Sequence, residues 1–71
     1  MNKFNIYEVV FKRNDGYWTN ELYYDKDRAI ENCALKSGSY DEAIVYEYVE
    51  NGGIFYVTRS ILHYGDEENV E

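Results

Sequence analysis

Hydrophobic and polar residues alternate along two long stretches of the chain, and a glycine-containing turn sequence interrupts each stretch. Asp15-Gly16 divides the first stretch, and Asn51-Gly52 divides the second. An Asp-Gly or Asn-Gly pair between two alternating runs is a strong hairpin signal, because a type I′ turn needs positive φ at both central residues. The pattern therefore predicts two β-hairpins, with strands over residues 3–12, 17–24, 42–50 and 54–63.

Between the hairpins, over residues 25–37, the hydrophobic period changes from that of a strand to that of a helix. Asp25 is a suitable N-cap, Lys36 complements the last turn and Gly38 follows it. The inner stripe expected from i, i+3 and i+4 spacing consists of Ala29, Ile30, Cys33, Ala34 and Ser37. The predicted fold is α+β with the order ββαββ, an antiparallel four-stranded sheet with one helix packed on one face. The pattern leaves the strand order open.

The register of the first hairpin follows from a two-residue loop at Asp15-Gly16. This loop gathers a set of apolar side chains on one face, which is expected to lie under the helix: Tyr7, Val9, Phe11, Trp18, Leu22 and Tyr24. A three-residue loop that includes Asn14 would instead set Val9 opposite Glu21 and mix apolar with charged side chains. Because a one-residue slip moves a whole strand to the other face, the pattern favours the two-residue loop.

The same reasoning pairs Tyr48 with Phe55 and Tyr46 with Val57 in the second hairpin. This face is the more aromatic one, so it is predicted to form the core under the helix. A bulge near Arg59 would alter the pairing, and the fourth strand is long enough to contain one. The opposite face of this hairpin carries Val45, Val49, Ile54 and Tyr56.

A chain of 71 residues makes a single domain, which we assign to residues 1–65, followed by an acidic tail at 66–71 that we expect to be flexible. So small a domain buries only about 60% of the surface of its unfolded chain and often needs a disulfide, a metal or a partner subunit. Cys33 is the only cysteine, which excludes an internal disulfide and fits a reducing, cytoplasmic setting. No signal peptide is evident, and no stretch approaches the roughly 18 apolar residues of a membrane span.

The charge balance narrows the classes of partner. Fourteen acidic residues against seven basic ones give a net charge of −7. Affinity for DNA and RNA comes from lysine and arginine side chains that neutralise phosphates, so direct nucleic-acid binding is not expected. An acidic surface suits a basic protein partner, and it also favours solubility.

Few residues indicate catalysis or metal binding. Cys33 is expected on the inner stripe of the helix and His63 at the end of a strand, so no nucleophile meets a base. One cysteine and one histidine, with no CxxC or HxxxH spacing, also argue against a zinc site. Glu8, Glu21 and Glu47 are expected on the sheet face away from the helix, as solvated carboxylates. We therefore predict no catalytic residue, no metal ligand and no cofactor.

The nine tyrosines are well above ordinary usage. Tyrosine supplies a large contact area at low entropic cost and is enriched in protein interfaces. The candidate partner-binding residues are therefore the apolar and acidic side chains of the face away from the helix, together with the acidic tail. They are Tyr23, Glu21, Glu47, Tyr56, Val45, Val49, Ile54, Asp66, Glu67 and Glu68.

The tyrosine-rich strands ELYYD and VYEYVENGGIFYV, the negative charge and the single compact domain define the general character of the chain. In this character it resembles small acidic proteins of phages and other mobile elements, of the anti-CRISPR and anti-defence inhibitor type. The resemblance covers the whole chain, contains no diagnostic motif and assigns a role to no individual residue. It implies a protein that acts in the host cytoplasm by occupying the surface of another protein, sometimes a basic surface where nucleic acid would bind.

Two functions are consistent with these observations. The first is a non-enzymatic inhibitor or modulator that binds a larger, basic protein. The alternative is a structural or assembly protein whose apolar second sheet face forms a homodimer, with no inhibitory target. A small enzyme or ligand-binding domain ranks third, because it requires a preformed pocket with converging polar groups within a very short chain.

Overall fold

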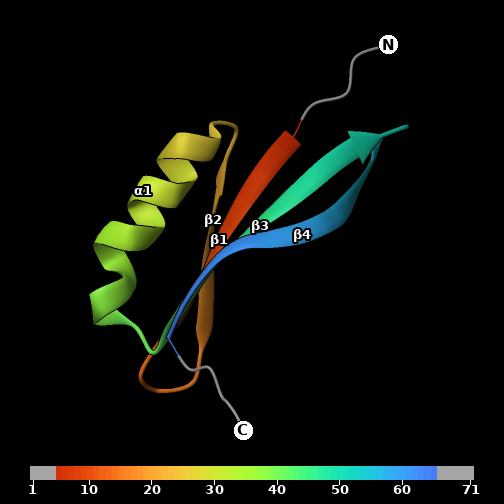
Figure 1. The fold of residues 1–71 in the computed structure, drawn as a ribbon. Helices are drawn as coiled ribbons and strands as arrows, with labels where there is room; N and C mark the ends of the chain where they lie inside the picture. Colours follow the sequence, from red (N-terminus) through yellow and green to blue (C-terminus); the bar gives the residue numbers. More distant parts are fainter. Residues whose placement is uncertain (1–4, 66–71) are drawn as a thin grey trace, which may run out of the picture.

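The computed structural model describes residues 5–65, and these residues form four strands and a helix (Figure 1). The elements are β1 (Asn5–Lys12), β2 (Trp18–Tyr23), α1 (Lys26–Lys36), the short 3-10 helix η1 (Ser37–Ser39), β3 (Glu42–Asn51) and β4 (Ile54–Gly65). The predicted α+β fold with the order ββαββ is confirmed. The predicted tail, residues 66–71, lies outside the described residues.

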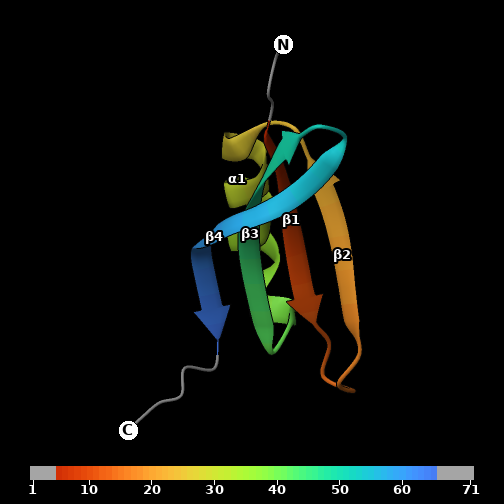
Figure 2. The same cartoon turned by 90° about the vertical axis from the view of Figure 1, so that its right-hand side faces the viewer.

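The strands lie in the order β2-β1-β3-β4, and every neighbouring pair is antiparallel. The helix connects the edge strand β2 to β3, and β1 lies between these two strands in the sheet. α1 packs on one face of the sheet, against β1, β2 and β3 (Figure 1). Viewed from the side opposite the helix, β4 is the strand nearest the viewer (Figure 2). We call the side with α1 the covered face and the other side the open face.

The helix touches the sheet along a narrow line. The Asp25 side chain accepts a hydrogen bond of 2.9 Å from the backbone N–H of Asp27, so the predicted N-cap is confirmed. Ala29 and Cys33, one turn apart, are fully buried. Ala34 is exposed, and its predicted place on the inner stripe is wrong, because it lies about 100° around the helix from Cys33. Small side chains on the contact line allow α1 to lie close to the sheet.

The loop of the first hairpin has three residues, not two. The backbone N–H of Gly16 donates to the carbonyl of Arg13 at 2.9 Å, and that of Arg13 donates to the carbonyl of Tyr17 at 2.7 Å. Gly16 has φ +92°, the left-handed conformation that closes a three-residue loop and that glycine adopts without steric cost. Val9 therefore faces Glu21. The predicted two-residue loop and its register are wrong.

This one-residue difference reverses β2 with respect to the covered face. Tyr23, opposite Tyr7, lies on the covered face and packs against the core. Leu22, opposite Glu8, lies on the open face with 64% of its surface exposed. Trp18 and Tyr24 are exposed as well, so the predicted core positions of Trp18, Leu22 and Tyr24 are wrong.

The second hairpin is also reversed with respect to the helix. Val45 pairs with Val9, so it lies on the covered face and is fully buried. Tyr46 and Tyr48, predicted to lie under the helix, lie on the open face instead. The covered positions of β3 opposite Val9 and Phe11 hold the small side chains Val45 and Ala43, and these are buried together with Ala29 and Cys33 of α1.

The turn of the second hairpin lies one residue later than predicted. Asn51 pairs with Ile54, which makes Gly52-Gly53 the two-residue loop, and both glycines have positive φ. The pairing is thus displaced by two residues, with Tyr48 opposite Val57 instead of Phe55. A displacement by two residues leaves each side chain on its predicted side of the hairpin.

β4 is irregular in its middle. The register with β3 shifts twice, on either side of Arg59 and Ser60, so the bulge considered near Arg59 is present. Extra residues in one strand increase its twist and bend it. One result is that two consecutive side chains, Ile61 and Leu62, pack against the core. A second result is the sharp bend of β4, whose first half sweeps across the front of Figure 2 before the second half turns downward.

The core lies between α1 and the two central strands. Its buried members are Tyr7, Val9, Phe11, Ala29, Cys33, Ala43 and Val45. The ring of Tyr40, from the segment after η1, covers that of Phe11 with 4.7 Å between the ring centroids. At the far end of β4, Gly65 has φ +105°, and a Cβ there would lie 2.3 Å from the carbonyl oxygen of Asp41. Glycine therefore permits the last pairing of β3 with β4.

Candidate binding surface on the open face

Two of the predicted partner-binding residues, Glu21 and Tyr23, join β2 to the helix. The Tyr23 hydroxyl donates to Glu21 Oε1 at 2.5 Å, and Lys36 Nζ lies 2.8 Å from Glu21 Oε2. Asn32 of α1 donates to the Tyr23 hydroxyl. The hydrogen bond from Lys36 lowers the pKa of Glu21, and the Glu21 carboxylate raises the pKa of Tyr23. Their predicted place on the face away from the helix is wrong, and their polar groups already have partners within the fold.

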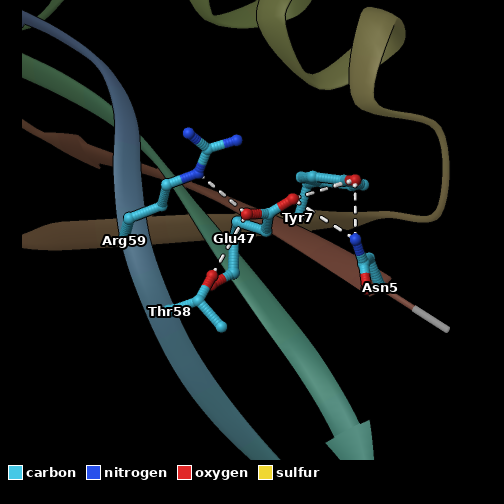
Figure 3. A network of polar contacts seen from close by, with 5 residues as sticks. All are labelled: Asn5, Tyr7, Glu47, Thr58 and Arg59. Atoms are coloured by element: carbon cyan, nitrogen blue, oxygen red, sulfur yellow. Dashed lines mark hydrogen bonds and ion pairs between the residues drawn. The ribbon is translucent and has the colours of Figure 1, made fainter. Parts of the chain in front are cut away.

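Glu47 lies on the covered face as well, where it binds several donors (Figure 3). One oxygen accepts from Arg59 Nε at 2.9 Å and from the Thr58 hydroxyl at 3.1 Å. The other accepts from the Asn5 amide at 3.3 Å and the Tyr7 hydroxyl at 3.4 Å. The hydrogen bond from Arg59 lowers the pKa of Glu47. This carboxylate therefore ties β1, β3 and β4 together, and its predicted place on the opposite face is wrong.

The predicted apolar candidates are divided by the structure. Val45 is fully buried and Val49 is half-buried, so Val45 is excluded as a contact residue. Ile54 and Tyr56 are exposed, but they lie on the side of β3 and β4 that continues the covered face. The remaining candidates, Asp66, Glu67 and Glu68, lie outside the described residues.

No other element of residues 5–65 packs over the open face as a second layer. By strand register its apolar members are Ile6, Val10, Trp18, Leu22, Ile44, Tyr46, Tyr48, Phe55 and Val57. Trp18, Leu22, Phe55 and Val57 are among the exposed large hydrophobic residues of the protein. A grouping of exposed apolar side chains on one surface is typical of an interaction site.

A depression of about 250 Å³ lies in this face. Its lining comes from all four strands and consists of Ile6, Glu8, Asn20, Leu22, Tyr48 and Phe55. β2 and β4 are opposite edges of the sheet, so Leu22 and Phe55 line one depression only because the sheet curls. The bend of β4 provides this curl, and in Figure 2 its first half passes in front of β3 and β1.

Glu8 is the one acidic residue that lines this depression. The Tyr48 hydroxyl donates to Glu8 Oε1 at 2.8 Å, and the Asn20 amide donates to Oε2 at 2.9 Å. The Glu8 carboxylate raises the pKa of Tyr48, because deprotonation would remove this hydrogen bond and place two negative charges together. Within residues 5–65, Glu8 forms no ion pair with a lysine, arginine or histidine. Its predicted position on the face away from the helix is confirmed.

Two other surface depressions are less suited to binding. One, of about 310 Å³, lies between the first hairpin loop and Tyr40, and another, of about 290 Å³, lies beside the outer surface of α1. The first has charged and polar walls, from Arg13, Asn14, Asp15 and Ser39 beside Tyr40. The second includes Tyr23 and Asn32, whose polar groups bind each other. Neither combines apolar walls with a converging polar group as the depression around Glu8 does.

Metal-binding, nucleophilic and membrane-spanning features were also considered for the described residues. No group of three or more histidine, cysteine, aspartate or glutamate side chains in residues 5–65 is placed to hold a metal ion. Cys33 lies in the core, and burial raises the pKa of its thiol, whereas His63 lies on the open face against Glu42. The one α-helix of the described chain is too short and too polar to cross a membrane.

Comparisons with known proteins place no further constraint on the surface. No protein-family model, curated protein sequence or solved structure gives a significant match to the chain.

Proposed function

We propose that this protein is a non-enzymatic binding protein whose open face docks on another protein and thereby inhibits or modulates it. The observation that carries this proposal is the set of large apolar side chains exposed on an uncovered sheet face. Tryptophan, tyrosine and phenylalanine are enriched in protein interfaces, and all three occur on this face.

The charges of the open face favour a protein rather than a nucleic acid as the partner. Among residues 5–65 the open face carries two basic side chains, Lys12 and His63, and both lie against Glu42. Lys12 Nζ is 3.9 Å from Glu42 Oε2, and His63 Nε2 is 3.1 Å from Glu42 Oε1. With Glu8 and Glu50 also on this side, the face offers no cluster of cations for phosphates. The net charge of −7 adds attraction toward a basic partner and speeds its association.

The resemblance to anti-defence inhibitors bears on what binding would do. Proteins of that type act by occupying a functional surface of a larger host protein, and here the open face is the surface available for that role. Inhibition or modulation by steric occupation requires no chemistry from the small protein itself. This fits an apolar surface whose depression is lined by one hydrogen-bonded carboxylate, Glu8.

Homodimerisation through the same face is the second candidate. Its supporting observation is also the exposed apolar set, since pairing two copies would bury it. Light scattering over a range of protein concentrations separates the two functions. A stable dimer that loses its partner copy on Leu22→Ser would favour the structural role, whereas a monomer favours a different protein as the partner.

Affinity capture from host-cell extract tests the binding function. The bait is the full chain, compared with Leu22→Ser on the open face and Leu35→Ser on the outer surface of α1. Both leucines are exposed, so neither substitution is expected to unfold the protein. We expect a protein that is retained by the unaltered chain and by Leu35→Ser but lost with Leu22→Ser. A captured protein that is insensitive to Leu22→Ser contradicts the proposal.

A further inference from the structure

We propose that the depression around Glu8 is a receptor for one arginine side chain that projects from the protein partner. This inference rests on the proposed function and specifies the chemistry of recognition. Its elements are a carboxylate without a cationic partner among residues 5–65, apolar and aromatic walls, and a volume that suits one side chain.

The carboxylate retains capacity for a cation. A carboxylate has about four acceptor sites on its two oxygens, and Tyr48 and Asn20 occupy one on each oxygen of Glu8. One site per oxygen is left, which is the arrangement that accepts two parallel N–H groups of a guanidinium. The two donors from the protein also hold the carboxylate in position before a ligand arrives, so little side-chain entropy remains to be lost on binding.

The walls favour arginine over lysine. Ile6 and Leu22 are aliphatic, whereas Tyr48 and Phe55 are aromatic. A guanidinium is planar and weakly hydrated, and it stacks on aromatic rings, whereas an ammonium is compact and strongly hydrated. The methylene groups of an arginine side chain would contact the aliphatic walls while its charged end meets Glu8.

The volume argues for a side chain rather than a separate small molecule. At about 250 Å³ the depression is smaller than the roughly 300–1,000 Å³ typical of ligand pockets. It lies among exposed apolar residues that a partner surface would cover at the same time. One anchoring side chain surrounded by flat apolar contacts is a common arrangement at the centre of protein interfaces.

Charge argues against a second copy of this chain as the occupant. Two copies paired through their open faces would bring together two proteins that each carry a net charge of −7, and each would present Glu8. Like charges within a desolvated interface are costly. A basic partner removes this cost and supplies the cation that Glu8 lacks among residues 5–65.

Titration of the labelled protein with short peptides, followed by amide NMR, tests the receptor directly. The probes are capped Gly-Gly-Arg-Gly-Gly, the same peptide with lysine, and the same peptide with citrulline, which is the neutral isostere of arginine. We expect shifts for the arginine peptide that concentrate on Glu8, Asn20, Leu22, Tyr48 and Phe55. The lysine peptide should bind more weakly, and the citrulline peptide should cause no saturating shift.

Two glutamate substitutions separate the local site from the overall charge. Glu8→Gln and Glu47→Gln each remove one negative charge, but only Glu8 lines the depression. We expect Glu8→Gln to weaken binding of the arginine peptide by about tenfold or more, since a hydrogen-bonded ion pair is lost. Glu47→Gln should change the binding by less than about twofold.

Three results would overturn the arginine receptor: equal effects of the two glutamine substitutions, equal binding of the citrulline peptide, or no response at this face with the arginine peptide in the millimolar range. Failure of this inference is distinguishable from failure of the proposed function. If the captured partner is lost with Leu22→Ser but retained by Glu8→Gln, the open face binds protein without an arginine anchor. If the partner ignores Leu22→Ser, the proposed function fails whatever the peptides do.

Discussion

The two faces of the sheet use similar residues for different purposes. On the covered face, Val9 and Val45 are fully buried beneath Ala29 and Cys33 of the helix. On the open face, large apolar side chains such as Trp18, Leu22 and Phe55 are exposed. The difference shows that the size of an apolar side chain does not determine its burial here. Packing against the helix is what differs, since Phe11 on the covered face belongs to the buried core, whereas Phe55 on the open face does not.

Two glutamates, one on each face, also differ in how many of their acceptor sites are used within the fold. Glu47 accepts hydrogen bonds from four side chains, and one of them is the cation Arg59. Glu8 accepts from two neutral side chains, Tyr48 and Asn20. Glu47 is thus satisfied within the fold, whereas Glu8 retains acceptor capacity on an exposed apolar surface. This comparison separates a structural carboxylate from a candidate recognition residue.

Alanine substitutions of one phenylalanine on each face should give the largest difference in the free energy of unfolding. Phe11 is 1% exposed and Phe55 is 43% exposed. We expect Phe11→Ala to lower the free energy of unfolding by about 3–5 kcal/mol, because it opens a cavity in the core. Phe55→Ala should cost about 1 kcal/mol or less. Urea unfolding followed by circular dichroism measures both.

If Phe11→Ala is too unstable to fold, its spectrum is that of an unfolded chain, which agrees with the expectation. Equal stability losses for Phe11→Ala and Phe55→Ala would contradict the distinction between a covered and an open face. Phe55→Ala should at the same time weaken binding of the arginine peptide, because its ring lines the depression.

Substitutions of Cys33 test whether water is excluded from the core under the helix. Replacement by serine puts a hydroxyl into a fully buried site, and we expect a loss of about 1–3 kcal/mol in unfolding free energy. Cys33→Ala removes the sulfur without adding a polar group and is the matched control, with a smaller loss. In the unaltered protein burial raises the pKa of the thiol, so labelling by thiol reagents should be slow and should accelerate with urea. Fast labelling of the folded protein would be incompatible with this packing.

Glu47→Gln should have an intermediate effect that depends on pH. The pKa of Glu47 is lowered in the folded state, so its stabilising effect is present above the ordinary carboxyl pKa and is lost as pH falls through the folded value. We expect a loss of about 1 kcal/mol at neutral pH, since the ion pair with Arg59 is partly solvated. The difference between Glu47→Gln and the unaltered protein should shrink as the solution is acidified. A constant difference across the acid range would exclude the proposed role of the charge.

Loss of the hydrogen bond between Tyr48 and Glu8 should give the smallest effect, which is a change in the pH at which Tyr48 titrates. The pKa of Tyr48 is raised, so the hydrogen bond contributes below the ordinary tyrosine pKa and is lost as pH rises through the folded value. The pKa of Tyr23 is raised as well, by its hydrogen bond to Glu21. We expect two tyrosines to titrate late by near-ultraviolet absorbance and one of them to return toward the ordinary range in Glu8→Gln. Tyr48→Phe removes the same late component and identifies it.

Local chemistry was sufficient to predict the elements of this fold. The alternation around the two glycine turns predicted both hairpins, and Asp25 marked the start of the helix. Ala29 and Cys33 were correctly predicted to face the sheet. Each of these features depends on interactions between residues a few positions apart, so the local sequence pattern is enough to predict it.

The assignment of faces failed in both hairpins, and in the first hairpin the error comes from one position. Gly16 can close either a two-residue or a three-residue loop, and the two differ by a slip that exchanges Tyr23 with Leu22. The rejected three-residue alternative would have placed Glu21 correctly. Amphipathicity misled the choice, because the helix satisfies Glu21 through Lys36, and this partner is distant in the sequence.

In the candidate site, too, one part was predicted from the sequence and another part depends on the tertiary structure. Glu8 was placed on the open side from the sequence, but its neighbours could not be inferred, since Leu22 and Phe55 come from opposite edges of the sheet. The strand order and the bends in β4 bring them around one depression. Short-range propensity and turn chemistry specify which segments become strands and helix. The order of the strands and the face that remains open depend on long-range packing, in which a helix with small side chains can lie close to only one side of the sheet.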